Sequence, residues 1–216
     1  MKVLVIQPKI GMGDMIIYLP YIHAISKKYG VSVSILVKEN SRAKELLAED
    51  NHIKEIILLD RNKKYLGSHD GIKGFFNLIK EIKAKNFDRV FIFNSSIRYF
   101  LIAKLAGIKD IFQYPLFKKN KQHITETAKT FLRDSVNIED LNDPKIEINK
   151  NNVKEAILKF DISKKNTNIL LGIGGSGPTK RIPAKIFIKF MEDIIKTKNC
   201  RFFLATGRNE DEQNIL

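Results

Sequence analysis

The sequence lacks several features that would place the protein outside the cell or in a membrane. Its single cysteine, Cys200, cannot form an internal disulfide or a cysteine-based zinc site, which agrees with a reducing compartment. No segment approaches the roughly 20 consecutive apolar residues that span a bilayer. The N-terminus also lacks the charged, apolar and small-residue regions of a signal peptide. The sequence therefore predicts a cytoplasmic protein.

Acidic residues are also scarce relative to basic ones. The chain has 38 Lys and Arg against 24 Asp and Glu, a net charge of +14. This excess favours anionic partners such as phosphorylated substrates, anionic lipid or nucleic acid. The lysines are spread along the whole chain beside many Ile and Asn residues, a pattern that genomic base composition alone can generate. No nucleic-acid recognition motif is present, so a non-catalytic nucleic-acid- or anion-binding module stays an alternative and nucleic acid is not the expected partner.

Short apolar runs that fit buried parallel strands alternate with segments of helical period. The predicted strands are Val3–Ile6, Val31–Val37, Ile56–Leu59, Val90–Phe93, Ile169–Ile173 and Phe202–Ala205. The predicted helices are Asp14–Tyr29, Ser41–Glu49, Ile72–Lys85, Ile97–Ala106, Thr125–Asp134, Val153–Phe160 and Ala184–Lys196. This alternation predicts an α/β fold in which helices cover both faces of parallel sheets.

A polar and charged segment between Asn149 and Thr167 separates two such units. We expect a complete Rossmann-like domain at residues 1–149 and the start of a second one at residues 150–216. Two strands with one or two helices cannot bury both faces of a sheet, so the second domain is expected to be truncated.

The first candidate site is a glycine turn between a strand and a helix that we expect to begin at Asp14. Gly11 and Gly13 allow positive φ and let a ligand approach the helix N-terminus, where the dipole favours negative charge. A dinucleotide-binding motif needs glycine where Ile16 stands, which disfavours the alternative of an NAD-type Rossmann oxidoreductase. Asp14 either caps the helix or accepts a proton from an incoming hydroxyl, and the spacing leaves both possibilities open.

The second candidate site is a glycine loop that brings together backbone N–H groups, hydroxyls and cations, a combination that suits a diphosphate. Pro178 stands where a Walker A loop needs lysine, which disfavours a P-loop NTPase. A surface loop with solvated lysines is the structural alternative. The candidate phosphate-binding residues are Gly175, Ser176, Thr179, Lys180 and Arg181.

Four segments together resemble glycosyltransferase family 9, the ADP-heptose:lipopolysaccharide heptosyltransferases. "IGMGDMIIYLPYIHAI" is similar to the family's G-D-x-(apolar)-LP motif, with Gly13, Asp14, Leu19 and Pro20 in register. "GIGGSGPTKRIP" resembles its phosphate loop, with Ile182 in place of the usual aromatic residue. "FDRVFIFNSSIRYFLIAKLAG" and "FFLATGRNEDE" resemble two further strand-and-turn segments. The resemblance implies the GT-B architecture of two Rossmann-like domains.

The resemblance also implies an inverting, metal-independent transfer without a cofactor, from a nucleotide sugar, ADP-heptose by family default, to an anionic lipopolysaccharide-core glycan. Asp14 would be the general base, and Lys180 with Ser176 and Thr179 would stabilise the leaving diphosphate. The family's later nucleotide-binding segment would lie beyond Leu216, so a chain ending there is expected to lack the adenosine pocket. An inactive remnant is therefore a further alternative.

Polar residues after the fourth predicted strand are candidates for the acceptor side. Ser96 and Arg98 follow that strand at its carboxyl end and could hold an anionic sugar, although ordinary turn and N-cap chemistry explains the serine equally well. The segment from Arg98 to Lys121 mixes aromatic, apolar and basic residues. It either forms a core helix with solvated lysines or rests peripherally on the inner face of an anionic membrane.

Overall fold

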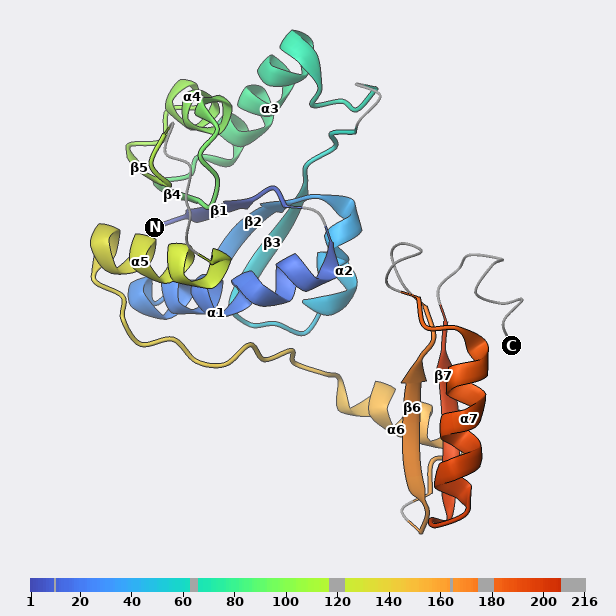
Figure 1. Cartoon of the computed structure of the whole chain (residues 1–216). Helices are drawn as coiled ribbons and strands as arrows, with labels where there is room; N and C mark the ends of the chain where they lie inside the picture. Colours follow the sequence, from blue (N-terminus) through green and yellow to red (C-terminus); the bar gives the residue numbers. More distant parts are fainter. Residues whose placement is uncertain (10, 63–65, 117–122, 164, 175–180, 207–216) are drawn as a thin grey trace. The chain divides into compact units, whose positions relative to one another are not determined.

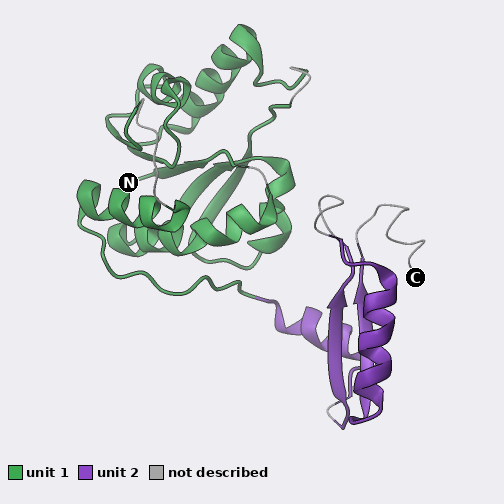
Figure 2. Ribbon diagram, in the orientation of Figure 1, with its two compact units in different colours: residues 1–147 green, residues 148–216 purple. Residues whose placement is uncertain are grey.

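The computed structural model describes residues 1–216 except 10, 63–65, 117–122, 164, 175–180 and 207–216. It divides into unit 1, residues 1–147, and unit 2, residues 148–216 (Figure 2). The strands are β1 (Val3–Gln7), β2 (Val33–Val37), β3 (Ile53–Leu58), β4 (Arg89–Ile92), β5 (Asp110–Gln113), β6 (Thr167–Gly172) and β7 (Cys200–Ala205). The helices are α1 (Met12–Tyr29), η1 (Glu39–Ser41, 3-10), α2 (Ala43–Leu46), α3 (Gly71–Lys85), α4 (Ile97–Leu105), α5 (Ile124–Val136), α6 (Lys150–Lys159) and α7 (Ala184–Ile195).

Unit 1 is built on a five-stranded sheet in the order β3-β2-β1-β4-β5, with every neighbouring pair parallel (Figure 1). The chain starts at the central strand β1, adds β2 and β3 on one side, and then crosses to add β4 and β5 on the other. The direction of winding therefore changes between β1 and β4. All five carboxyl ends meet at one edge of the sheet, and the gap at this change of direction is where such sheets bind ligands.

The two faces of this sheet bury separate apolar clusters, because successive side chains of a strand point to opposite faces. Val3 and Val5 belong to the cluster covered by α1 and α5. Leu4 and Ile6 belong to the cluster covered by α3 and α4. The predicted parallel α/β fold with helices on both faces is confirmed for unit 1.

The structure of unit 1 differs from the prediction most clearly in one strand and two helices. Strand β5 was not predicted, because only Ile111 and Phe112 form its apolar run. Helix α1 begins at Met12 rather than Asp14, since Gly11, with φ 117° and ψ 155°, is the residue that precedes the helix. The long predicted second helix is replaced by η1 and the one-turn α2, because the left-handed conformation of Arg42, with φ 55°, interrupts it.

Unit 2 contains a two-stranded parallel sheet, β6 and β7, together with α6 and α7. Among its described residues, Ile173 is the one buried apolar side chain, and neither helix has a buried residue. Several large apolar side chains of unit 2 are exposed, including Leu158, Ile186 and Leu170. The strand and helix predictions for this unit agree with the structure to within a few residues at each end.

Candidate functional site

A pocket of about 370 Å³ opens at the carboxyl edge of the unit 1 sheet. Lys9 comes from the segment after β1, Ser96 from the segment after β4, and Tyr114 from the residue after β5. Tyr18 of α1 and Thr127 of α5 complete the wall on the helical side. The pocket therefore lies beside the gap between β1 and β4, the ligand-binding position that the sheet topology indicates.

Aromatic rings form one wall of this pocket. The ring of Phe93 packs edge-on against Tyr18, at 5.2 Å between centroids, and against Tyr114, at 5.7 Å. Phe131 of α5 supports Tyr114 from 5.1 Å. Tyr21 ties α1 to α5 by donating its hydroxyl hydrogen to the carbonyl of Thr125, at 2.9 Å. These contacts give the pocket a wall of interlocked rings, which holds the Tyr18 and Tyr114 side chains in place.

The hydroxyl groups of Tyr18 and Tyr114 are buried and make no hydrogen bond of normal geometry with the described part of the chain. Burial is the main cause that raises the pKa of both, so both hydroxyls keep their protons at neutral pH. The side-chain amide of Gln7, at the end of β1, is also buried without a described partner. Gln7 is not among the residues that line the pocket, whereas Tyr18 and Tyr114 are. Because buried polar groups are nearly always hydrogen-bonded, the two tyrosine hydroxyls are available to a polar ligand in the pocket.

Asp14 lies in the first turn of α1, one helical turn before Tyr18, and its side chain is half-buried. Burial is the largest cause of the raised pKa of Tyr18, and the negative charge of Asp14 raises it further, whereas the neighbouring Tyr114 hydroxyl lowers it. No hydrogen bond or ion pair joins its carboxylate to another residue that the structure describes. The N-cap residue is Gly11, so the alternative that Asp14 caps this helix is wrong.

The two glycines of the first turn have different positions. Gly11 has the positive φ predicted for it, and a Cβ there would come 3.9 Å from Oδ2 of Asp14. Gly13 is the second residue of α1 and has helical φ, so the prediction that it forms the turn is wrong. A Cβ at Gly13 would meet no atom within 4 Å. The Gly11 turn therefore sits directly beside the Asp14 carboxylate, and the surface at Gly13 is open.

Ser96 is the N-cap residue of α4 and lines the pocket. Its backbone N–H donates to Oδ1 of Asn94 at 2.8 Å. The side-chain amide of Gln113 donates to the carbonyl oxygens of Asn94, at 2.7 Å, and Ser96, at 2.9 Å. The last residue of β5 therefore fixes the backbone of the turn that follows β4. Ser96 makes no side-chain cap hydrogen bond, which leaves its hydroxyl at the pocket wall.

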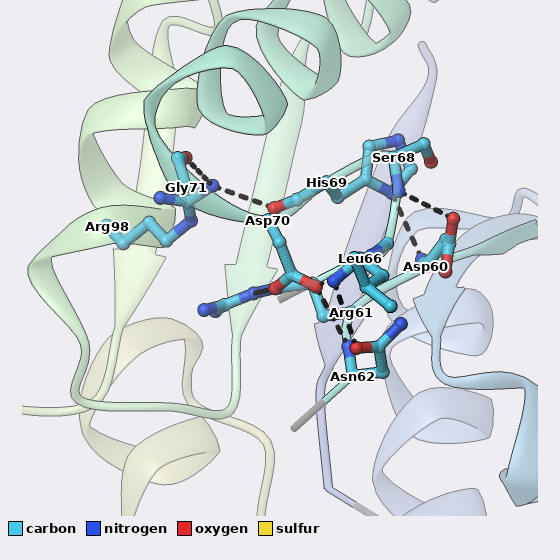
Figure 3. A network of polar contacts seen from close by, with 10 residues as sticks. Asp60, Arg61, Asn62, Leu66, Ser68, His69, Asp70, Gly71 and Arg98 are labelled. Atoms are coloured by element: carbon cyan, nitrogen blue, oxygen red, sulfur yellow. Dashed lines mark hydrogen bonds and ion pairs between the residues drawn. The ribbon is translucent and has the colours of Figure 1, made fainter. Parts of the chain in front are cut away.

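The side chain of Arg98 reaches the loop before α3, where it contacts His69 and Gly71 (Figure 3). Its Nη2 donates to the carbonyl oxygens of His69, at 2.9 Å, and Gly71, at 3.2 Å, and its guanidinium lies over the ring of Phe75. Burial, and then the nearby charge of Arg61, lower the pKa of Arg98. Arg98 is not among the residues that line the pocket, so the structure does not bring it together with Ser96.

The same close-up shows the polar contacts among the described residues between β3 and α3, 59–62 and 66–70 (Figure 3). Oδ2 of Asp70 accepts the backbone N–H groups of Asn62 and Gly67, both at 3.0 Å, and Oδ1 accepts Nε of Arg61 at 3.2 Å. These hydrogen bonds lower the pKa of Asp70, and the one from the backbone N–H of Asn62 has the largest effect. The Asp70 carboxylate thus joins the two described parts of this segment, and Arg98 contacts the start of α3.

The predicted phosphate-binding loop falls mostly outside the described residues. Gly175, Ser176, Thr179 and Lys180 all lie there, so their roles stay predictions. Arg181 is described and half-buried, in the segment that leads to α7. Pro183 is the N-cap residue of that helix, close to the predicted first turn.

Sequence reasoning missed the aromatic wall and its two tyrosines. Tyr18 could have been found from its position four residues after Asp14, on the same side of α1. Tyr114 could not be placed without β5, which was itself not recognised. Gln113 carried no signal of its own, because its role depends on the neighbouring turn.

Together, the sheet order, the helices on both faces and the pocket beside the change of direction define an α/β protein with a GT-B-like fold. Three solved structures share it. Heptosyltransferase II of E. coli aligns with 99% of this chain and 67% of its own, at a TM-score of 0.74 and 17% identity. A family 9 glycosyltransferase of Veillonella parvula aligns with 97% of this chain and 70% of its own, at a TM-score of 0.70 and 17% identity. E. coli heptosyltransferase WaaC with ADP-2-deoxy-2-fluoro heptose aligns with 100% of this chain and 71% of its own, at a TM-score of 0.67 and 12% identity. No protein-family model and no curated protein matches the sequence.

Proposed function

We propose that this chain is part of an inverting glycosyltransferase that moves a sugar from a nucleoside-diphosphate sugar to a hydroxyl of a cell-envelope glycan. The observation that carries this proposal is the Asp14 carboxylate, which lies in the first turn of α1, one turn before the pocket residue Tyr18, and has no described hydrogen-bond or ion-pair partner. Two of the similar structures are named for WaaC with ADP or an ADP-linked fluoro heptose. ADP-heptose is therefore the donor to test first, with a lipopolysaccharide-core acceptor.

In the proposed reaction, Asp14 is the general base. The acceptor hydroxyl gives its proton to the Asp14 carboxylate as its oxygen forms a bond to the anomeric carbon of the donor. The bond from that carbon to the diphosphate oxygen breaks, and the nucleoside diphosphate leaves with the electron pair. Attack from the face opposite the leaving group inverts the configuration. No step of this reaction requires a metal ion.

The acceptor pocket contributes binding and orientation in this proposal. The protonated hydroxyls of Tyr18 and Tyr114 can hydrogen-bond to sugar hydroxyls, and the aromatic wall offers apolar ring faces to the sugar. Lys9 supplies a positive charge at the rim, which suits an anionic acceptor. Lys180, Ser176, Thr179 and Arg181 are proposed to bind and neutralise the diphosphate.

The replacement Asp14→Asn tests the base directly. The amide keeps the size of the side chain but cannot take a proton, so kcat should fall roughly 10²- to 10⁴-fold. Release of ADP from ADP-heptose in the presence of a lipopolysaccharide-core acceptor measures this. Asp134→Asn on α5 is the matched control, because Asp134 is an exposed acid outside the pocket, and it should retain the wild-type rate. An Asp14→Asn variant with a near-normal rate would remove Asp14 from this role.

Donor binding is tested separately through the second loop. Titration with ADP, UDP and GDP, followed by calorimetry, should show diphosphate binding that Lys180→Met weakens about tenfold or more, since a charge-assisted contact to phosphate is lost. Lys198→Met, a change of the same type on unit 2, should leave the affinity unchanged. Equal affinity of all three proteins would remove Lys180 from the donor site.

A further inference from the structure

Helix α4 is apolar on its outer face as well as on its inner face. Its inner face packs Tyr99, Ile102 and Ala103 into the core. On the opposite side, Ile97, Leu101 and Leu105 repeat every four residues and are exposed, Leu105 by 54%. A helix at the surface of a soluble domain normally turns polar residues outward, so an apolar outer face indicates a partner.

Helix α3, which packs beside α4, extends this apolar surface. Ile72 is 79% exposed and Phe76, one turn further on, is 60% exposed. The inner side of α3 buries Leu78 and Ile82, and its side toward α4 carries Phe75, which lies under the guanidinium of Arg98. Around the circumference of α3, helical spacing places Ile72 and Phe76 next to Phe75, on the side away from the core. The two exposed rows therefore belong to one outer layer, which we call the α3–α4 face: Ile72, Phe76, Ile97, Leu101 and Leu105.

Basic side chains accompany this face. Together α3 and α4 contain six basic residues and one acid, Glu81, which pairs with His69. Lys80 and Lys83 of α3 are exposed and make no hydrogen bond or ion pair with a described residue. By helical spacing, Lys83 projects along the same side as Ile72 and Phe76. The face thus combines apolar side chains with uncompensated positive charge.

We propose that the α3–α4 face is a docking surface for an anionic lipid membrane, into which Phe76, Leu101 and Leu105 insert at the level of the headgroups. Both chemical features of the face have a counterpart in such a surface. Acyl chains accept the apolar side chains, and anionic headgroups attract the lysines. A nucleic-acid backbone would use the lysines but would leave the apolar rows in water. The proposal does not depend on the transferase reaction.

The described chain contains no helix long and apolar enough to cross a bilayer, so the contact proposed here is peripheral. It differs from the membrane contact that the sequence left open as an alternative. Of the segment from Arg98 to Lys121, β5 is a strand of the sheet and Tyr114 lines the pocket, so neither belongs to the outer face. Helix α3, outside that segment, supplies Ile72 and Phe76, two of the five residues of the face.

Flotation with lipid vesicles tests the proposal on the whole chain. The protein should float with vesicles of phosphatidylglycerol and phosphatidylcholine and stay behind with phosphatidylcholine alone. Phe76→Ser with Leu105→Ser should weaken binding at least tenfold, because the inserted apolar area is lost. Lys80→Gln with Lys83→Gln should weaken it about 25-fold, since each lysine near an anionic surface contributes about fivefold. All four side chains are exposed, and circular dichroism checks that the fold is kept.

Matched variants in unit 2 serve as controls. Leu158→Ser with Ile186→Ser removes two exposed apolar side chains, and Lys150→Gln with Lys154→Gln removes two exposed lysines. Both control variants should bind the vesicles as the wild type does. Loss of binding in the controls but not in the α3–α4 variants would overturn the proposal. So would equal binding to neutral vesicles, or a concentration-dependent dimer in sedimentation that Leu105→Ser abolishes, since the occupant would then be a second copy.

Discussion

Units 1 and 2 are built from the same sequence of strand, glycine turn and helix, yet they bury very different amounts of apolar surface. In unit 1, five strands and the helices on both faces enclose side chains such as Phe91 completely. In unit 2, two strands leave comparable side chains such as Leu170 and Ile186 in contact with water. Local pattern determines which elements form, and the number of neighbouring elements determines how much each one stabilises the fold.

The largest expected difference between the units concerns their cores. Phe91→Ala should lower the stability of unit 1 by roughly 3–5 kcal/mol, because Phe91 is fully buried and packs against Phe112 at 4.9 Å. Phe202→Ala in unit 2 should cost only about 1 kcal/mol, since Phe202 is half-buried. All six tyrosines precede residue 148 and the chain has no tryptophan, so tyrosine fluorescence in a denaturant titration reports unit 1 separately. Far-ultraviolet circular dichroism in the same titration also includes the helices of unit 2 and measures the effect of Phe202→Ala. Equal losses would contradict the difference in burial.

The glycines of the two units provide a second comparison. Gly11→Ala should destabilise unit 1 by about 1–3 kcal/mol, because φ 117° with ψ 155° is a conformation that residues with a Cβ rarely adopt. Gly172→Ala in β6 should change stability by less than about 0.5 kcal/mol, as its Cβ would meet no atom and its φ is unstrained. Thermal unfolding of both variants measures this. A tolerated Gly11→Ala would show that the turn does not need glycine.

Removal of a paired carboxylate should also cost more stability in unit 1 than in unit 2. Asp50 is buried and accepts hydrogen bonds from His23, at 2.7 Å, and from the backbone N–H of His52, at 2.9 Å. Asp50→Asn should therefore cost about 1–2 kcal/mol. In unit 2, Asp161 pairs with Arg201 at the surface, so Asp161→Asn should change stability by less than about 0.5 kcal/mol. Chemical denaturation of the two variants would contradict this ranking if the surface variant lost more.

The smallest expected effect is a dependence on pH that only unit 1 shows, because all four histidines lie in it. Burial, and then the charge of His23, lower the pKa of His52 below its ordinary 6.5. The folded state therefore binds a proton less readily than the unfolded chain. The contribution of His52 to stability should be complete above pH 6.5 and decline as the pH falls below that value.

Asp50 adds a second step at lower pH. Burial opposes its ionisation, but hydrogen bonds from His23 and His52 outweigh burial and lower its pKa below 3.8. Its contribution is present above pH 3.8 and is lost as the pH falls through the lowered value. Tyrosine fluorescence midpoints between pH 8 and pH 3 would show both steps, and His52→Gln should remove the first. A pH-independent midpoint between 8 and 5 would contradict the assignment to His52.

The parts of the fold that could be predicted are those in which a short stretch of sequence determines its own environment. The continuous apolar runs of β1, β2 and β4 predict strands buried on both faces, and the apolar period of α3 predicts a surface helix. Strand β5 has a much weaker pattern, and it forms because β4 offers it an open edge. Such an element depends on tertiary context, which no local window contains.

The candidate site was predictable to the same extent. Asp14 was singled out because a glycine turn at the end of the first strand marks a ligand-binding position in any open parallel sheet, and its role stays a prediction. The start of its helix was misplaced by two residues, since two glycines and an acid within four residues offer several possible N-caps. The pairing of Tyr18 with Tyr114 joins positions 96 residues apart, so only the folded chain reveals it.

The backbone of the turn after β4 is held by Gln113, through the carbonyl oxygens of Asn94 and Ser96. Neither the Ser95 nor the Ser96 hydroxyl takes part in a hydrogen bond with the described residues, although both side chains line the pocket. The backbone of the turn is thus held by one set of groups, and the hydroxyls that line the pocket belong to another. Ligand preference can drift at these two positions, in evolution or in a directed library, while the scaffold beneath them stays intact.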